Sequence, residues 1–406
     1  MKRYYKIAAV TFLSIIISAC EDNVSVDRND NEIDINLPSR NYIVFQTEVN
    51  TKAALVEDKY ISDDFGVYAY QYDFGKSWNG QRFSNIIPNV FWNVSESIKK
   101  PLKVTESGGF YTYNASNADD GDAGQIQWSG NKYAFFGYYP YEHPSMTLSG
   151  MEAEGAPYIT YTVNKSDATQ MVDLLTGGIS EITAASTNNT VTFSMSHRLA
   201  GVDVSICNAY QYTYQSAVDG EGKPVYTQEP IDIEIYDLTV EFSNLTYDKA
   251  KIFLEQNKAV PGLNTKPENV SGTTASYKLI GTGSNTGKAE YTVNPTIDEN
   301  TIITAETGTS MTFIPQTENL SVKTTITYKK KRTHTDEYIR EGEDEEGNPL
   351  YDSNGYYTVV KNTSFDQPLR EGSRYFVLLT FTSEAVSINI ITTEAWDETE
   401  VEYEFV

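Results

Sequence analysis

Apolar residues recur along this chain in short runs, and sustained helical periodicity is rare. The runs are rich in tyrosine, phenylalanine, threonine and valine, which suit pleated, half-buried strands. Strands are expected at residues 42–46, 65–70, 133–139 and 158–163, and turn-rich stretches such as 117–122 lie between them. The pattern predicts an all-β chain.

The second half of the chain shows the same pattern with longer runs. Residues 191–195 and 202–206 are expected to form one long strand with a bend. Two long hairpins follow, with tips at 219–226 and 341–349, where glycine, proline and charged residues favour turns.

The last eight residues alternate regularly. Val401, Tyr403 and Phe405 would face one side of a strand, and the intervening glutamates would face the other. This pattern is typical of a half-buried strand with a charged outer edge, and it is available to pair in its own sheet or in that of another molecule.

The start of the chain has the pattern of a secretory signal. Basic residues at 2, 3 and 6 precede an apolar run over 7–17, which is too short to span a membrane, and then come Ser18, Ala19 and Cys20. Ile17-Ser18-Ala19-Cys20 resembles the bacterial lipobox, so residues 1–19 are expected to be removed by a cut between Ala19 and Cys20, and Cys20 to be lipidated. The alternative is an ordinary signal with a chance cysteine.

Composition narrows the classes of partner. Lys+Arg 31 against Asp+Glu 56 gives a formal net charge of −25, which argues against nucleic acid and against docking on an anionic membrane surface. Length 406 suggests two or three domains. Once Cys20 is lipidated, Cys207 has no disulfide partner, and it is expected to be buried and inert.

No pattern of catalytic or metal-binding residues stands out. His143, His197 and His334 lack the spacing of metal ligands, and the acidic tip at 341–346 does not match a calcium loop. Neither a nucleophile elbow nor a phosphate loop is present. Paired carboxylates for glycoside hydrolysis stay open, but no pair is singled out. We expect no cofactor and no enzymatic activity.

Taken together, the motifs resemble the fimbrillin family of surface pilins and pilin-like lipoproteins from anaerobic Gram-negative bacteria. The resemblance covers most of the chain, in order. Its pieces are the lipobox at Cys20, residues 43–46 with Thr51-Lys52-Ala53, residues 64–70, 134–140, 170–175, 191–200 and 313–316, and the closing stretch 369–396.

The resemblance implies two transthyretin-like β-sandwich domains in tandem and travel to the outer membrane as a lipoprotein. In the pilins of the family a surface protease, often Arg-specific, cuts after the first strand. Loss of that strand opens a groove in the N-terminal domain, and a strand from another subunit fills it.

Mapped onto this sequence, the removable strand is Tyr42–Val49 and the cut falls between Lys52 and Ala53. The donor is the tail Thr399–Val406, with Val401, Tyr403 and Phe405 as its inserting side chains. Position 52 departs from the family because it is lysine and not arginine. Arg40 precedes the strand, where cleavage would release the anchor without opening a groove.

The expected organisation is a lipidated tether with the removable strand at 20–52, an N-terminal domain at 53–189 and a C-terminal domain at 190–406. The expected function is a fimbrial subunit whose partners are other subunits, identical or homologous, joined by strand addition, with the membrane reached through lipid on Cys20. The alternative is a surface lipoprotein that never polymerises and acts as an anchor, an adhesin of host or bacterial surface ligands, or a glycan binder.

Overall fold

The chain divides into two contact units, residues 1–40 and Asn41–Val406. The first unit lies outside the residues described by the structure, which is a computed structural model. The described residues are 42–49, 61, 63–78, 82–94, 98–107, 110–116, 124–187, 189–255, 265–281, 291–293, 301–303, 311–383 and 385–393. They form strands almost throughout, so the all-β prediction is confirmed. Their helical elements are η1 (Ala168–Gln170) and α1 (Ala184–Thr187), and none is long and apolar enough to cross a membrane.

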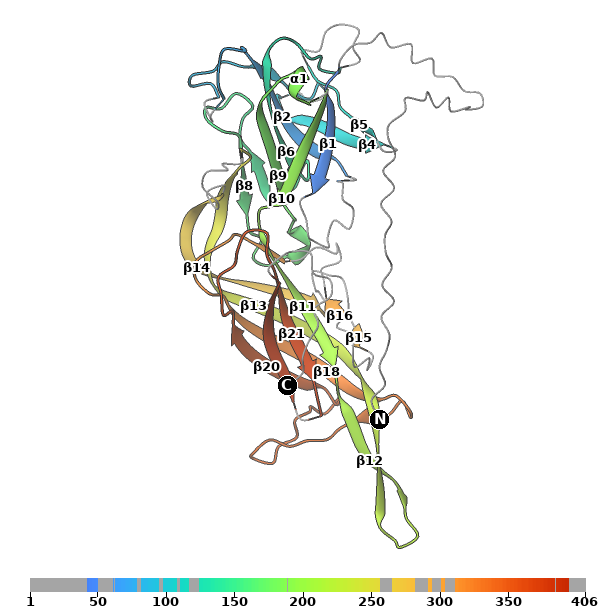
Figure 1. The fold of residues 1–406 in the computed structure, drawn as a ribbon. Coiled ribbons are helices and arrows are strands. Elements are labelled where there is room, and N and C mark those ends of the chain that lie inside the picture. Colours follow the sequence, from blue (N-terminus) through green and yellow to red (C-terminus); the bar gives the residue numbers. More distant parts are fainter. Residues whose placement is uncertain are drawn as a thin grey trace, which may run out of the picture. The chain divides into compact units, whose positions relative to one another are not determined.

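Strand pairing within the described residues gives three sheets (Figure 1). The eight-stranded sheet has the order β1 (Val44–Val49), β10 (Thr190–His197), β9 (Leu175–Ile182), β6 (Lys132–Tyr139), β2 (Phe65–Tyr72), β4 (Leu102–Ser107) and β5 (Phe110–Thr112), with β3 (Asn89–Phe91) paired to β2. The five-stranded sheet has the order β16 (Thr301–Ile303), β11 (Ala200–Asn208), β21 (Arg374–Phe381) and β22 (Val386–Thr393), with β17 (Met311–Phe313) paired to β11.

The nine-stranded sheet is built around one strand of 30 residues, β13 (Pro224–Phe253). Its order is β19 (Tyr338–Ile339), β18 (Ser321–Arg332), β13, β8 (Tyr158–Thr162) and β7 (Met146–Leu148). Additional strands β12 (Gln211–Val218), β14 (Thr265–Ile280) and β15 (Tyr291–Val293) pair with β13, and β20 (Tyr357–Ser364) pairs with β18. Both predicted hairpins belong to this sheet.

The central strands of the first sheet are buried on both faces. Along β2, Phe65, Val67 and Ala69 pack into one apolar cluster, while Tyr68 and Tyr70 pack into another. Strand β6 divides its side chains in the same way. Strands that are covered on two faces carry apolar residues at successive positions, which explains the continuous runs seen in the sequence. The second cluster also contains apolar residues of β11, β13 and β21, so it joins this sheet to the other two.

The expected single bent strand over 191–206 is wrong. Residues 190–197 form β10, which pairs with β1 and β9, and residues 200–208 form β11, which pairs with β21 in a different sheet. Between them, the Arg198 N–H donates to the Leu174 carbonyl, and its guanidinium binds Thr176 and Glu371. Strand β8 in turn pairs with β13. Thus β10 belongs to the first sheet and β8 to the nine-stranded sheet, and the expected domain ranges stay a prediction.

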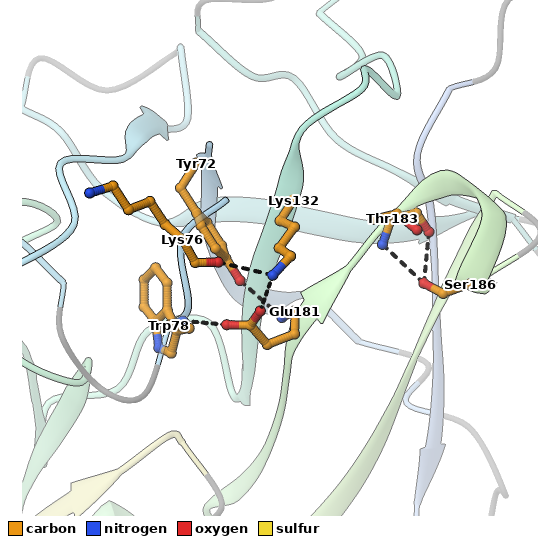
Figure 2. Close-up of polar contacts among 7 residues, drawn as sticks. All are labelled: Tyr72, Lys76, Trp78, Lys132, Glu181, Thr183 and Ser186. Atoms are coloured by element: carbon orange, nitrogen blue, oxygen red, sulfur yellow. Dashed lines mark hydrogen bonds and ion pairs between the residues drawn. The ribbon is translucent and has the colours of Figure 1, made fainter. Parts of the chain in front are cut away.

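A polar cluster fixes one end of the β2–β6–β9 region (Figure 2). The Glu181 carboxylate lies 2.7 Å from the Lys132 ammonium and accepts the backbone N–H of Trp78, and the Tyr72 hydroxyl accepts the backbone N–H of Glu181. Burial opposes ionisation of Glu181, but these donors outweigh it and hold the pKa of its carboxyl below its usual value. The contacts also hold Glu181 at φ 61°, which is unfavourable for a residue with a side chain.

A buried ion pair connects β11 to β21. The Arg374 Nε lies 2.5 Å from the Asp203 carboxylate, and both side chains are almost fully buried. Cys207, on the same strand β11, is 1% exposed, as expected from the sequence.

We predict that Asp203→Ala lowers the free energy of unfolding by about 3–5 kcal/mol, because it leaves the Arg374 charge buried without its carboxylate. The matched control is Glu221→Ala, which breaks the exposed pair with Lys223 and should change stability by less than about 0.5 kcal/mol. Urea titration followed by far-ultraviolet circular dichroism measures both. Equal losses in the two variants would contradict the prediction.

Alkaline pH should destabilise the fold. Burial raises the pKa of Tyr68 to about 12 and that of Tyr210 to about 12. The unfolded chain loses tyrosine protons near pH 10, so the stabilisation is complete below about pH 10 and is lost as the pH rises towards 12. Melting temperatures between pH 8 and 12 measure this loss. Tyr68→Phe should flatten the decline, whereas replacement of the exposed Tyr226 by phenylalanine should leave it unchanged.

Candidate functional site

The first strand, β1, lies at the edge of the eight-stranded sheet, beside β10 (Figure 1). The two strands run parallel, with Phe45 opposite Val191 and Thr47 opposite Phe193. In the part of the chain that the structure describes, β10 is the one strand that pairs with β1. The ladder therefore holds β1 from one side only.

Side chains of β1 and the residue before it alternate between the core and the surface. Ile43, Phe45 and Thr47 are buried, whereas Val44, Gln46 and Glu48 are exposed. The period of two is the one expected for a strand with one buried face. The β1 segment thus supplies a row of three side chains to the cluster beneath the sheet.

Phe45 occupies the centre of that row in an aromatic site. Its ring centroid lies 4.9 Å from that of Tyr113, 5.2 Å from Phe135 and 5.7 Å from Phe193. Gly137 keeps the wall of the site close, because a Cβ there would lie 2.6 Å from the Met195 methyl carbon and 3.2 Å from the Phe193 ring. Tilted and edge-on aromatic contacts add about 0.5–1.5 kcal/mol each beyond burial.

The segment around Ile43 is held by hydrogen bonds outside the ladder. The Ile43 N–H donates to the Ile126 carbonyl at 2.9 Å, and the Tyr113 hydroxyl donates to the Ile43 carbonyl at 2.8 Å. The Val44 N–H donates to the Asn189 carbonyl at 3.1 Å. The strand is thereby positioned at its start by segments from three parts of the chain.

Thr47 closes a ring of three hydrogen bonds. The Ile61 N–H donates to the Thr47 Oγ1 at 3.1 Å, and the Tyr111 hydroxyl donates to the Ile61 carbonyl at 2.9 Å. Because the Tyr111 proton is used in that bond, the 3.0 Å contact between the two hydroxyls has Thr47 as its donor. Tyr111 lies on β5, at the other end of the sheet, so this ring joins both ends of the sheet.

The environment of β1 defines a groove that the strand fills. Without residues 42–49, the free edge of β10 would expose unpaired N–H and C=O groups, and the sites of Ile43 and Phe45 would open as an apolar slot. Such an edge is a template for another strand, which would satisfy the backbone and fill the slot at once. The geometry therefore supports strand addition at this position.

Most of the residues predicted from the sequence to act in maturation lie outside the described part of the chain. These are Ala19, Cys20, Lys52, Ala53, Val401, Tyr403 and Phe405. The predicted removable strand Tyr42–Val49 is described, and it is the strand at the sheet edge. The contacts of Thr47 were not predicted, although its place two residues after Phe45 puts it in the inward phase of the alternation.

The three histidines lie in different settings, and His334 is exposed. His197 Nδ1 lies 2.7 Å from the Asp173 carboxylate, and both side chains are more than nine-tenths buried, which closes them to a substrate. His143 is half-buried, and burial holds its pKa below the usual value. Among the described residues, no group of three or more His, Cys, Asp or Glu side chains is placed to hold a metal ion.

Comparison with known proteins gives one related sequence and a shared fold. No protein-family model matches the chain. The fimbrium subunit Fim1C of Phocaeicola vulgatus is 28% identical over 205 residues, which are 47% of this chain and 48% of that protein. The match thus spans about half the length of this curated relative.

Among solved structures, a fimbrial protein from Bacteroides vulgatus is 20% identical and aligns with 87% of this chain and 99% of its own, with a TM-score of 0.52. The fimbrial anchor protein Mfa2 from Porphyromonas gingivalis is 12% identical over 87% of this chain and 97% of its own, and its TM-score of 0.29 is too low to carry an argument. The related fimbrial sequence and the shared fold confirm the resemblance to the fimbrillin family.

We predict that Phe45→Ala lowers the free energy of unfolding of the first sheet by about 3–5 kcal/mol, because it empties the aromatic site. Gln46→Ala, at the exposed neighbouring position, should cost less than about 0.5 kcal/mol. Denaturant titration compares the two, with Trp128 as an intrinsic fluorophore beside this core. A loss in Gln46→Ala as large as that in Phe45→Ala would mean that β1 is not held by its buried face.

Proposed function

We propose that this chain is a structural subunit of a cell-surface fimbria, exported as a lipoprotein and assembled by strand exchange. The observation that supports it is β1, an edge strand that completes an apolar core and, among the described residues, pairs with β10 alone. The fimbrial relative and the shared fold point to the same class of protein. In this proposal the chain has no enzymatic activity, and its two halves act as transthyretin-like β-sandwich domains in tandem.

Export begins with the signal at residues 1–19. Cleavage between Ala19 and Cys20 and lipidation of Cys20 would deliver the folded precursor to the outer membrane. A single acyl chain binds a membrane only marginally, so stable anchoring requires the two or three chains of a mature lipoprotein. In the fimbria, Cys20 would serve for delivery, because it is lost together with β1.

Assembly begins with a cut between Lys52 and Ala53, three residues beyond the end of β1 at Val49. Before the cut, β1 is tethered to its groove, and its high effective concentration keeps it in place. After the cut, β1 is a separate peptide that dilution can remove. A strand from another subunit then competes for the exposed edge of β10 and the sites of Ile43 and Phe45.

The tail of this chain would serve as the donor to a neighbouring subunit. Val401, Tyr403 and Phe405 alternate with glutamates, so one face of an extended tail can enter an apolar slot while the other stays in water. The tail follows β22, which lies at one edge of the five-stranded sheet in the described part of the chain.

A second candidate function is a surface lipoprotein that keeps its anchor and does not polymerise. Position 52 favours it, because lysine replaces the arginine that an Arg-specific protease would need. In that case Cys20 stays attached, β1 stays in its groove, and the protein acts as a fimbrial anchor, an adhesin or a glycan binder.

The test is the N-terminus and assembly state of protein shed from cells. The fimbrial function predicts that shed protein starts at Ala53 and runs as heat-sensitive ladders on unboiled gels, and that Lys52→Ala removes both. Arg40→Ala is the matched control and should leave assembly intact, since cleavage at Arg40 would not free β1. Protein that stays lipidated and monomeric would support the second candidate instead.

A further inference from the structure

We propose that the groove of β1 contains a hydroxyl-specific subsite at the position of Thr47, so that its partner is a strand from a different subunit and not the tail of a second copy of this chain. The proposal rests on the strand exchange proposed above and names the class of donor. That donor carries an aromatic side chain at the Phe45 site and a serine or threonine at the Thr47 site, with an apolar residue at the Ile43 site.

The hydroxyl requirement follows from the ring formed by Thr47, Ile61 and Tyr111. Thr47 and Ile61 are almost fully buried, so water does not readily replace a lost hydrogen-bond partner there. Loss of the hydrogen bond therefore costs free energy. Were the donor to place valine at this site, Tyr111 would keep its bond to the Ile61 carbonyl. The Ile61 N–H would lose the Thr47 oxygen as its acceptor, and a buried N–H without an acceptor is costly.

The remaining parts of the ring belong to the subunit that accepts the donor. Ile61 and Tyr111 both lie after the proposed cut at Lys52, so they stay with the mature chain when β1 leaves. The subsite is therefore read by the acceptor, and the donor must supply the missing hydroxyl.

The tail of this chain supplies no such strand in any register. Placed in the direction of β1 with Tyr403 at the Phe45 site, it brings Phe405 to the Thr47 site. Phenylalanine has no acceptor there, and it is much larger than the buried threonine. Placed in the opposite direction, the tail brings Val401 to the Thr47 site, where the shape fits but the acceptor is again missing.

Shifting the register by two residues does not help. In the opposite direction, such a shift brings Thr399 to the Thr47 site and Tyr403 to the Ile43 site. It leaves Val401 at the Phe45 site, where valine would underfill an aromatic pocket. Registers shifted by one residue turn the glutamates into the core. The tail thus fits the aromatic site or the hydroxyl site, but never both.

The experiment uses the soluble chain from Glu21 to Val406 with a site for a sequence-specific protease inserted after Lys52. After cleavage, fluorescent peptides compete for the groove, and polarisation measures their affinity. The peptide Tyr42–Val49 is expected to bind at least tenfold more tightly than the peptide Thr399–Val406. Thr47→Val in the first peptide should weaken binding about tenfold, and Thr47→Ser should keep most of the affinity.

A second readout is self-assembly of the cleaved chain carrying a changed tail. Phe405→Thr creates the required pattern in the direction of β1, and Val401→Thr creates it in the opposite direction. One of the two should increase homopolymer formation at least tenfold, and the one that does so reports the direction of the donor. Glu402→Thr, on the outward face, is the matched control and should change nothing.

The outcomes separate this proposal from the function on which it rests. Exchange of the β1 peptide together with equal binding of its Thr47→Val form would overturn the subsite while leaving strand exchange in place. A tail peptide that binds as tightly as the β1 peptide would do the same. If no peptide enters the cleaved chain, strand exchange itself fails, and the subsite proposal fails with it.

Discussion

The structure depends on one constraint: the core beneath the first sheet is completed by β1, which among the described strands pairs with β10 alone. Phe45 fills an aromatic site formed by Tyr113, Phe135 and Phe193. Strand β1 pairs with β10 in parallel. The other edge of β1 carries no ladder partner in the described residues. The core requires a strand in this position, and in the proposed assembly a segment with the same inward side chains would replace β1.

The other face of the same sheet packs against the rest of the molecule and not against β1. Tyr68, Tyr70 and Phe136 pack into a cluster that continues into the five- and nine-stranded sheets. The β10–β11 connection and the β8–β13 pairing join these parts covalently and by hydrogen bonds. One face of β2 and β6 is thus fixed by the rest of the molecule, while the other face relies on β1. In the proposed assembly, the contacts on the fixed face would hold the remaining fold together when the groove opens.

Sequence patterns were sufficient to predict an all-β chain and a strand at the position of β1. Alternation and aromatic content are local signs of burial, so they can be found without the tertiary structure. They failed at 191–206, where two successive strands look like one and only the tertiary pairing separates β10 from β11. They also could not reveal the ring at Thr47, which joins residues 14 and 64 positions apart. A threonine in the inward phase of Ile43-x-Phe45-x-Thr47 was the one local sign of it. The residues of the lipid anchor, the cut and the tail stay predictions of the sequence.

The central claim is that a strand from another subunit replaces β1 in the assembled fibre. Electron cryo-microscopy of fimbriae isolated from cells tests it most directly, because it shows which chain lies beside β10. The account predicts that residues 42–49 are absent, and that a neighbouring subunit's strand places an aromatic side chain between Tyr113 and Phe135. A fibre in which residues 42–49 still occupy the groove would contradict it.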